Sequence, residues 1–200
     1  SFSFFLSMQI KKFQGGYDSN FAYLIIEGKE CALIDPSVPS NEVLDYINEN
    51  NLQLKFVVVM HGHFDHTVEL QKYGCESYGH SLLKIKINNN IEDGDILSLS
   101  SLRFKVIYTP GHTQDAICIL IENNLFTSDT LFVEGCGRTD LEGGNTEQLW
   151  ESLEKLKQLP DNTIIYPGHD YGSTKTSTIG KEKENNRFFN KTKEEFLAIR

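Results

Sequence analysis

Three histidines and an aspartate lie within six residues of the chain, in the segment His61-Gly62-His63-Phe64-Asp65-His66. His61 and His63 are two residues apart, so on extended backbone they project in the same direction. Asp65 and His66 can turn toward a neighbouring point if a helix begins there. Imidazole and carboxylate groups are ligands for zinc, iron or manganese. The segment therefore predicts ligands for two neighbouring metal positions.

Three further side chains of the same types, His112, Asp129 and His169, each follow a predicted strand. Polar residues at the carboxyl ends of strands are where α/β proteins place their functional sites. His80 has no companion ligand in the sequence, and we expect it to be structural. The expected metal ligands are His61, His63, Asp65, His66, His112, Asp129 and His169.

A buried strand must position the histidine-rich segment. The run Phe56-Val57-Val58-Val59-Met60 is nearly continuous in apolar residues, which is typical of a strand buried on both faces, and it predicts a strand over 54–60. Further strands are predicted over 21–27, 31–34, 82–87, 96–99, 102–108, 117–121, 125–127 and 163–166. Helices are predicted over 41–50 after a Ser40 N-cap, over about 66–73, from a Thr146 cap, and from Thr192, which forms a capping box with Glu195.

Strands and helices mix along the whole chain, and no linker divides it. Pro110-Gly111-His112 and Pro167-Gly168-His169 each follow a strand, which suggests two related halves. The pattern predicts an α/β protein of two mixed sheets packed back to back, with helices on the outer faces. We expect one domain over residues 8–200, with residues 1–7 a vector-derived remnant or a disordered extension.

Composition narrows the function classes. The 200 residues carry 19 Lys and Arg against 28 Asp and Glu, a formal net charge of −9, whereas a nucleic-acid-binding protein needs a basic surface. No stretch of about 18 apolar residues is present, so no membrane span is predicted. The four cysteines lack CxxC spacing and are expected to be reduced thiols of a cytoplasmic protein. The expected partner is a small molecule, and the expected assembly is a monomer or a homodimer.

The histidine-rich segment resembles a known family. HGHFDH at 61–66 is similar to the HxHxDH signature of the metallo-β-lactamase superfamily, and the later ligands match in order and context. The resemblance covers the chain from about Gln9 to Arg200, and it implies an αβ/βα four-layer sandwich with the site at the sheet edges. It also implies two divalent metal ions, with zinc expected first and iron or manganese as alternatives. The implied first metal is held by His61, His63 and His112 and the second by Asp65, His66 and His169, with Asp129 bridging them.

The branch of the family follows from neighbouring residues. True β-lactamases carry Cys or Ser at the position of Asp129, and Gly135-Cys136-Gly137-Arg138 resembles two branches that act on glutathione-linked sulfur. The first is glyoxalase II (hydroxyacylglutathione hydrolase), which implies hydrolysis of small thioesters by a metal-bridging hydroxide that Asp65 orients. The second is the persulfide dioxygenases, which implies a single Fe(II) held by His61, His112 and Asp129. A non-catalytic metal-binding or redox domain is the less favoured reading.

Two side chains near the ligands are candidates for substrate binding. Arg138 can bind a substrate carboxylate at two points, or it can form a structural salt bridge with Asp140 or Asp170. Tyr171 can donate a hydrogen bond to the substrate, or it can simply pack beside His169. Asp140 stands where glyoxalase II has an aromatic residue, which favours the dioxygenase branch. The sequence leaves the two branches open.

Overall fold

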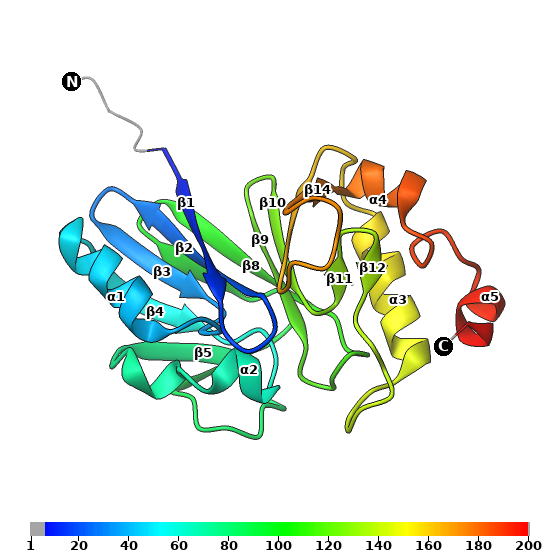
Figure 1. Ribbon diagram of the computed structural model, residues 1–200, viewed down its shortest axis with the longest axis horizontal. Helices are drawn as coiled ribbons and strands as arrows, with labels where there is room; N and C mark the ends of the chain where they lie inside the picture. Colours follow the sequence, from blue (N-terminus) through cyan, green and yellow to red (C-terminus); the bar gives the residue numbers. More distant parts are fainter. Residues whose placement is uncertain (1–6, 200) are drawn as a thin grey trace.

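The computed structural model describes residues 7–199, so the remnant or extension expected over residues 1–7 lies outside the described residues except for Ser7 (Figure 1). Within this range the chain forms two six-stranded sheets and a two-stranded ribbon. Figure 1 shows the sheets packed together in the middle of the molecule, with α1 on one outer side and α3 on the other.

The first sheet has the order β1-β2-β3-β4-β5-β6. Its first three strands are antiparallel neighbours, and β3 to β6 are parallel neighbours. The strands are β1 Gln9–Gly15, β2 Asn20–Glu27, β3 Glu30–Ile34, β4 Gln53–Val58, β5 Glu76–His80 and β6 Asn89–Ile91. Its helices are α1 Ser40–Glu49, α2 Phe64–Thr67 and the 3-10 turn Leu70–Lys72.

The second sheet has the order β14-β13-β10-β9-β8-β7, and only its β10–β13 pair is parallel. The strands are β7 Ile96–Leu99, β8 Leu102–Tyr108, β9 Ile117–Ile121, β10 Asn124–Ser128, β13 Ile164–Pro167 and β14 Ser177–Thr178. The ribbon is β11 Leu131–Phe132 with β12 Gly135–Cys136. The helices are α3 Thr146–Lys157, α4 Ile179–Asn185 and α5 Lys193–Ala198.

Strand β2 shows how the layers arise, because all eight of its residues are buried. Alternate side chains of a strand point to opposite faces of the sheet. Phe21 and Tyr23 enter the core between the two sheets, where they meet residues such as Phe126. Ala22 and Leu24 enter the core between the first sheet and α1. A third core lies between the second sheet and α3 to α5. The architecture is therefore the expected αβ/βα sandwich.

The strand predicted over 82–87 is wrong, because this segment forms turns between β5 and β6. Leu83, Ile85 and Ile87 do pack against the core under α1, so the alternation reflects burial without strand pairing. The neighbouring strands β5 and β6 were not predicted. Their sequences, ESYGH and NNI, are short and mostly polar, and they are held by parallel pairing with β4 and with each other.

Two of the predicted caps are also wrong. Ser40 lies inside α1, where its amide donates to Glu69 at 2.8 Å, and the cap position is Pro39. Asn145 caps α3 in place of Thr146, since its side chain accepts from the Gln148 amide. The short helix expected over 66–73 begins at Phe64 and is divided between α2 and the 3-10 turn. The capping box of Thr192 and Glu195 is confirmed at α5.

Candidate metal centre

The predicted ligands come together at one edge of the sandwich, where strands of both sheets end. The chain leaves β4 at Val58 in extended conformation, and α2 begins at Phe64. Two later ligands follow strands directly: Asp129 follows β10, and His169 lies two residues after β13. His112 lies in the connection from β8 to β9.

The first cluster contains His61, His63, His112 and Asp129, whose ligand atoms all lie within 4.8 Å of one another. His112 Nε2 lies 3.0 Å from His63 Nδ1 and 3.5 Å from Asp129 Oδ2. Asp129 Oδ2 lies 3.9 Å from His61 Nε2. Three imidazoles and a carboxylate therefore face one point.

The second cluster contains Asp65, His66 and His169, and its ligand atoms also lie within 4.8 Å of one another. His66 Nε2 lies 3.1 Å from His169 Nε2. Asp65 Oδ2 lies 3.4 Å from His66 Nε2 and 3.6 Å from His169 Nε2. This cluster has the ligand types of the first, with carboxylate oxygen and imidazole nitrogen but no thiolate.

Asp129 connects the two clusters. Its Oδ1 atom lies 3.4 Å from His66 Nε2, and its Oδ2 atom lies 3.2 Å from His169 Nε2 and 3.5 Å from His112 Nε2. One carboxylate therefore reaches ligand atoms of both clusters, which is the placement that a bridging ligand requires.

The donor atoms fit a pair of divalent cations. His61 Nε2 and Asp129 Oδ1 are buried and have no hydrogen-bond partner among the described residues. A buried polar atom without a partner is costly, and a bound cation removes that cost. Tetrahedral or larger coordination by nitrogen and oxygen suits zinc, iron or manganese.

Asp35 was not predicted as a site residue, yet it orients two of the ligands. It contacts the Nδ1 side of His66 directly and that of His61 through Ser128. Its Oδ2 atom lies 3.0 Å from His66 Nδ1 and accepts from Ser128 Oγ at 2.7 Å. Ser128 Oγ lies 3.3 Å from His61 Nδ1. Such outer contacts fix the ring orientation of metal ligands and leave Nε2 toward the metal. Asp35 directly follows β3, so its position at a strand end was a usable signal.

Backbone carbonyls orient two further ligands, His112 and His169. His112 Nδ1 lies 2.7 Å from the Arg138 carbonyl oxygen, and His169 Nδ1 lies 2.7 Å from the Asp18 carbonyl oxygen. A carbonyl oxygen only accepts, so each Nδ1 donates its proton and each Nε2 is left as the ligand atom. No sequence signal could have shown these contacts, because a carbonyl is present at every residue.

Asn20 is a second residue that sequence reasoning missed. It is fully buried at the start of β2, and its Nδ2 atom donates to Asp65 Oδ2 at 2.8 Å. The same Nδ2 atom lies 3.4 Å from His66 Nε2. The carboxamide of Asn20 therefore contacts two ligand atoms of the second cluster.

Burial and neighbouring charges shift the pKa values of several side chains in the site. Burial lowers the pKa of His61 well below its usual value, and the neighbouring His66 adds to the effect. Burial alone would lower the pKa of His66 too, but the carboxylates of Asp129 and Asp35 raise it to about 9. Burial opposes the charge on Asp129, yet the surrounding histidines, His66 first, hold its pKa well below the ordinary range. A metal ion must therefore displace a proton from His66.

The two predicted substrate contacts line one cavity of about 460 Å³, together with His112, Asp129 and Arg187. Arg138 is exposed and pairs with Asp140 through two contacts of 2.6 and 2.7 Å, which is one of the salt bridges expected for it. The Tyr171 ring stacks on His169 with centroids 4.7 Å apart, and its hydroxyl donates to the Asp18 carboxylate.

Neither His80 nor Cys136 belongs to a ligand cluster. His80 pairs with Glu92 at 3.1 Å and stacks on Tyr108. Cys136 is buried and lines the 460 Å³ cavity. Within residues 7–199 no disulfide joins the four cysteines.

The two sheets and the two histidine–aspartate clusters define a metal-binding α/β protein with two adjacent sites. The chain belongs to the metallo-β-lactamase superfamily, whose family profile matches residues 15–73 and 69–169. No helix among the described residues is both long enough and apolar enough to span a membrane.

Individual relatives agree with this assignment. The chain is 39% identical to a hydroxyacylglutathione hydrolase of Pseudoalteromonas translucida over 70% of its own length, and it spans 55% of that relative. It is 31% identical to a probable polyketide biosynthesis zinc-dependent hydrolase, BaeB, of Bacillus velezensis, covering 91% of this chain and 87% of that one. The crystal structure of ETHE1 from Myxococcus xanthus superposes with a TM-score of 0.91 at 34% identity, covering 96% and 89% of the two chains.

Proposed function

We propose that this chain is a metal-dependent hydrolase of small thioesters, of the glyoxalase II type. The observation that carries the proposal is the Asp129 carboxylate, which reaches ligand atoms of two complete clusters. Two cations held in this way would supply Lewis acidity and a hydroxide nucleophile near neutral pH. Relatives described as hydroxyacylglutathione hydrolase and as zinc-dependent hydrolase support the same class.

The reaction adds one water to the thioester and breaks its C–S bond, giving a carboxylic acid and a thiol. The chain's residues have separate roles in it. Asp129 would hold both cations, and Asp65, whose Oδ2 atom accepts from Asn20, would orient the attacking water and accept its proton. The thiolate needs little acid assistance to leave, because thiol pKa values are about 8.5.

The 460 Å³ cavity is the proposed site for the carrier thiol. Arg138 and Arg187 line it, and a guanidinium there suits a carboxylate of a glutathione-like thiol. The Arg138–Asp140 pair is exposed, and such pairs contribute little to stability, so a substrate carboxylate can replace Asp140 at the guanidinium.

The test is hydrolysis of S-lactoylglutathione by the zinc-loaded protein, followed at the loss of thioester absorbance. We expect turnover that disappears on chelation and returns with zinc. A chain that holds two zinc ions and leaves this thioester and simpler acyl-glutathiones intact would contradict the proposal.

A second candidate is a mononuclear iron dioxygenase that acts on glutathione persulfide. The observation that favours it is the Asn20 carboxamide, which contacts two ligand atoms of the second cluster and, in this candidate, would take the place of a second metal there. A single iron would then be held by His61, His112 and Asp129. Oxygen uptake by the iron-loaded protein with glutathione persulfide tests this candidate, and one bound iron per chain with rapid uptake would replace the hydrolase proposal.

A further inference from the structure

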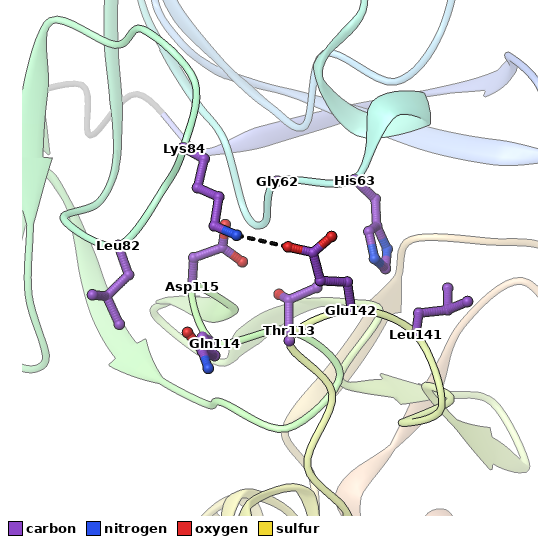
Figure 2. Close-up of a pocket in the computed structure, with 10 residues that line it drawn as sticks. Gly62, His63, Leu82, Lys84, Thr113, Gln114, Asp115, Leu141 and Glu142 are labelled. Carbon is purple, nitrogen blue, oxygen red and sulfur yellow. Dashed lines mark hydrogen bonds and ion pairs between the residues drawn. The ribbon is translucent and has the colours of Figure 1, made fainter.

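We propose that the cavity on the His63 side of the metal centre binds a protonated amine carried by the acyl part of the substrate. The cavity has a volume of about 310 Å³, and its lining includes Gly62, His63, Thr113 and Asp115 (Figure 2). It borders the first cluster through His63, whereas the cavity proposed for the carrier thiol borders it through His112 and Asp129. The inference rests on the proposed thioesterase function, which assigns the thiol to the other cavity.

Two polar side chains of this cavity are buried without partners. Asp115 is 8% exposed and Thr113 is 6% exposed. Neither Asp115 Oδ1 nor Thr113 Oγ1 has a hydrogen-bond partner among the described residues. A buried carboxylate oxygen can only accept, and leaving it unpaired costs more than the average hydrogen bond contributes. These two atoms therefore offer a ready site for a hydrogen-bond donor, and the carboxylate prefers a cationic one.

Gly62 creates the room for this carboxylate inside the metal-binding segment. A Cβ atom at residue 62 would lie 2.6 Å from Asp115 Oδ2, closer than carbon and oxygen can approach. Asp115 is thus packed directly against the backbone between His61 and His63. The arrangement keeps an acidic group next to the metal ligands without making it one of them.

The charges around the cavity favour a cation. Its charged lining residues are Asp115, Glu142 and Lys84, and Lys84 Nζ is paired with Glu142 Oε1 at 2.8 Å. Among the ion pairs of the described residues, none includes Asp115. In Figure 2 a dashed line joins Lys84 to Glu142, and the Asp115 side chain is drawn next to the end of Lys84. Two carboxylates and one ammonium therefore line this partly buried cavity, and the ammonium is paired with Glu142 rather than with Asp115.

The experiment compares three thioesters of one thiol with acyl groups of similar size: 3-aminopropionyl, 3-hydroxypropionyl and butyryl. We expect kcat/KM of the zinc-loaded protein to be about 10-fold or more higher for the aminoacyl thioester than for butyryl, since a charged hydrogen bond contributes about 1.5–3 kcal/mol. Asp115→Asn should abolish this preference, so that the kcat/KM values of the aminoacyl and butyryl thioesters come to within about twofold of each other. Asp45→Asn, which removes the same group from an exposed position on α1, should keep it.

Lys84→Met is expected to change the substrate preference in the opposite direction. It removes the positive charge nearest Asp115 at an exposed position, so the preference for the aminoacyl thioester should rise. Folding is followed by the thermal midpoint, and Asp115→Asn should be at least as stable as the parent, because it replaces an unpaired buried charge by a neutral amide. A large loss of stability in Asp115→Asn would assign the carboxylate a structural role and overturn the proposal.

A direct binding measurement tests the amine site separately from the proposed function. Propylammonium is titrated into the zinc-loaded protein while the backbone amide shifts of Gly62 and Thr113 are followed by NMR. Hydrolysis of all three thioesters at equal rates would support the thioesterase and overturn the amine site. If no thioester is cleaved, the proposed function fails, and the amine site then stands only if propylammonium shifts these amides in the parent and not in Asp115→Asn.

Discussion

Asp129 carries more of the metal centre than any other residue, since its two oxygens contact histidines of both clusters. Asp129→Ala removes the bridging carboxylate, so four buried imidazoles lose the negative charge that lies between them. We expect it to lower metal content below two per chain and to reduce kcat/KM by about 10³-fold, because Lewis-acid stabilisation is worth several kcal/mol. Metal analysis of the purified variant beside its activity checks this. Full metal content with activity retained would refute the site assignment.

His66 links metal binding to pH. Its pKa of about 9 in the metal-free site lies above the unfolded value of 6.5, so the folded protein binds this proton more tightly than the unfolded chain does. The resulting stabilisation of the metal-free protein is complete below about pH 6.5 and is lost as the pH rises through about 9. The bound metal requires the neutral ring.

We therefore expect zinc binding at pH 7.5 to release about one proton or more, and the zinc affinity to rise by about tenfold per pH unit toward pH 9. Calorimetry in two buffers with different ionisation enthalpies measures the proton release. His66→Gln should remove most of it, whereas His80→Gln, at a histidine outside both clusters, should not.

Asn20 is expected to position the second cluster. Asn20→Ala removes the donor to Asp65 and leaves that carboxylate less constrained. We expect affinity for the second zinc to fall by about 10–100-fold with the first site unchanged, as found for residues that orient metal ligands. A stepwise zinc titration followed with a competing chelator resolves the two sites. Tighter binding of the second metal would instead identify the carboxamide as its competitor.

The metal ligands could be predicted because the histidines, the aspartates and their spacing can be read in the sequence. The residues that contact and orient these ligands could not be predicted in this way. Asn20 and Asp115 are ordinary polar residues in the sequence. Folding brings Asn20 to Asp65, which lies 45 residues away in the chain, and it brings Asp115 against Gly62. The Arg138–Asp140 pair is one of the two salt bridges expected for Arg138 from the sequence.

Among the elements, the turn before His112 is tightly constrained. Gly111 has φ of +136°, and a Cβ there would lie 2.2 Å from the amide nitrogen of Leu149 in α3. Gly111 also holds the start of α3, since its carbonyl accepts from the Asn145 amide at 2.8 Å. Close packing of this turn against a helix backbone fixes where His112 points.

Gly111→Ala should therefore lower the free energy of unfolding by about 2–4 kcal/mol and weaken the first metal site. The matched control is Gly94→Ala, where φ is also positive at +86° but nothing lies within 4 Å of the added atom. The control should cost about 1 kcal/mol and leave metal affinity unchanged. Denaturant unfolding with zinc titration of both variants makes the comparison, and equal effects would show that backbone strain alone matters.

Strands were predictable where both faces are buried. The apolar runs of β2 and β4 reflect cores on the two sides of the first sheet. The short strands β5 and β6 owe their conformation to parallel neighbours that are distant in sequence, so their polar residues gave no periodic signal. The segment 82–87 shows the opposite case, in which a strand is predicted but none forms. One-sided burial of a turn segment produces the same alternation of apolar and polar residues as a strand.

On the scale of the whole molecule, the metal centre joins the two halves of the chain. His61, His63, Asp65 and His66 come from the first sheet, whereas the other ligands come from connections of the second. Three backbone hydrogen bonds of the described residues cross at this edge: the Phe21 amide donates to the Gly168 carbonyl at 2.8 Å, the Ile117 amide to the Met60 carbonyl at 2.9 Å, and the Asp170 amide to the Ser19 carbonyl at 3.1 Å. Bound metals would add further cross-links between the halves at the same edge.

Removal of metal should lower the stability of the entire chain. A zinc ion at a hundredfold excess over its Kd adds about 2.7 kcal/mol to the free energy of unfolding. For a chain of this size, chelation should lower the thermal midpoint by roughly 5–10 °C per site. Calorimetric scans with and without chelator measure the shift, and Asp129→Ala should show little further loss on chelation. An unchanged midpoint in the parent would contradict a bound metal at either cluster.

The contact between Asn20 and His169 pairs residues near opposite ends of the chain. During synthesis the ribosome releases the four early ligands long before the last one, so neither the second metal nor the closing strand contact can form until His169 has emerged. A nascent chain that stalls before this point exposes a half-built histidine cluster beside an uncovered sheet. The second metal site can therefore be completed only after His169 has been synthesised, and a shortage of metal or an early stop would leave the same edge of the sheets unfinished.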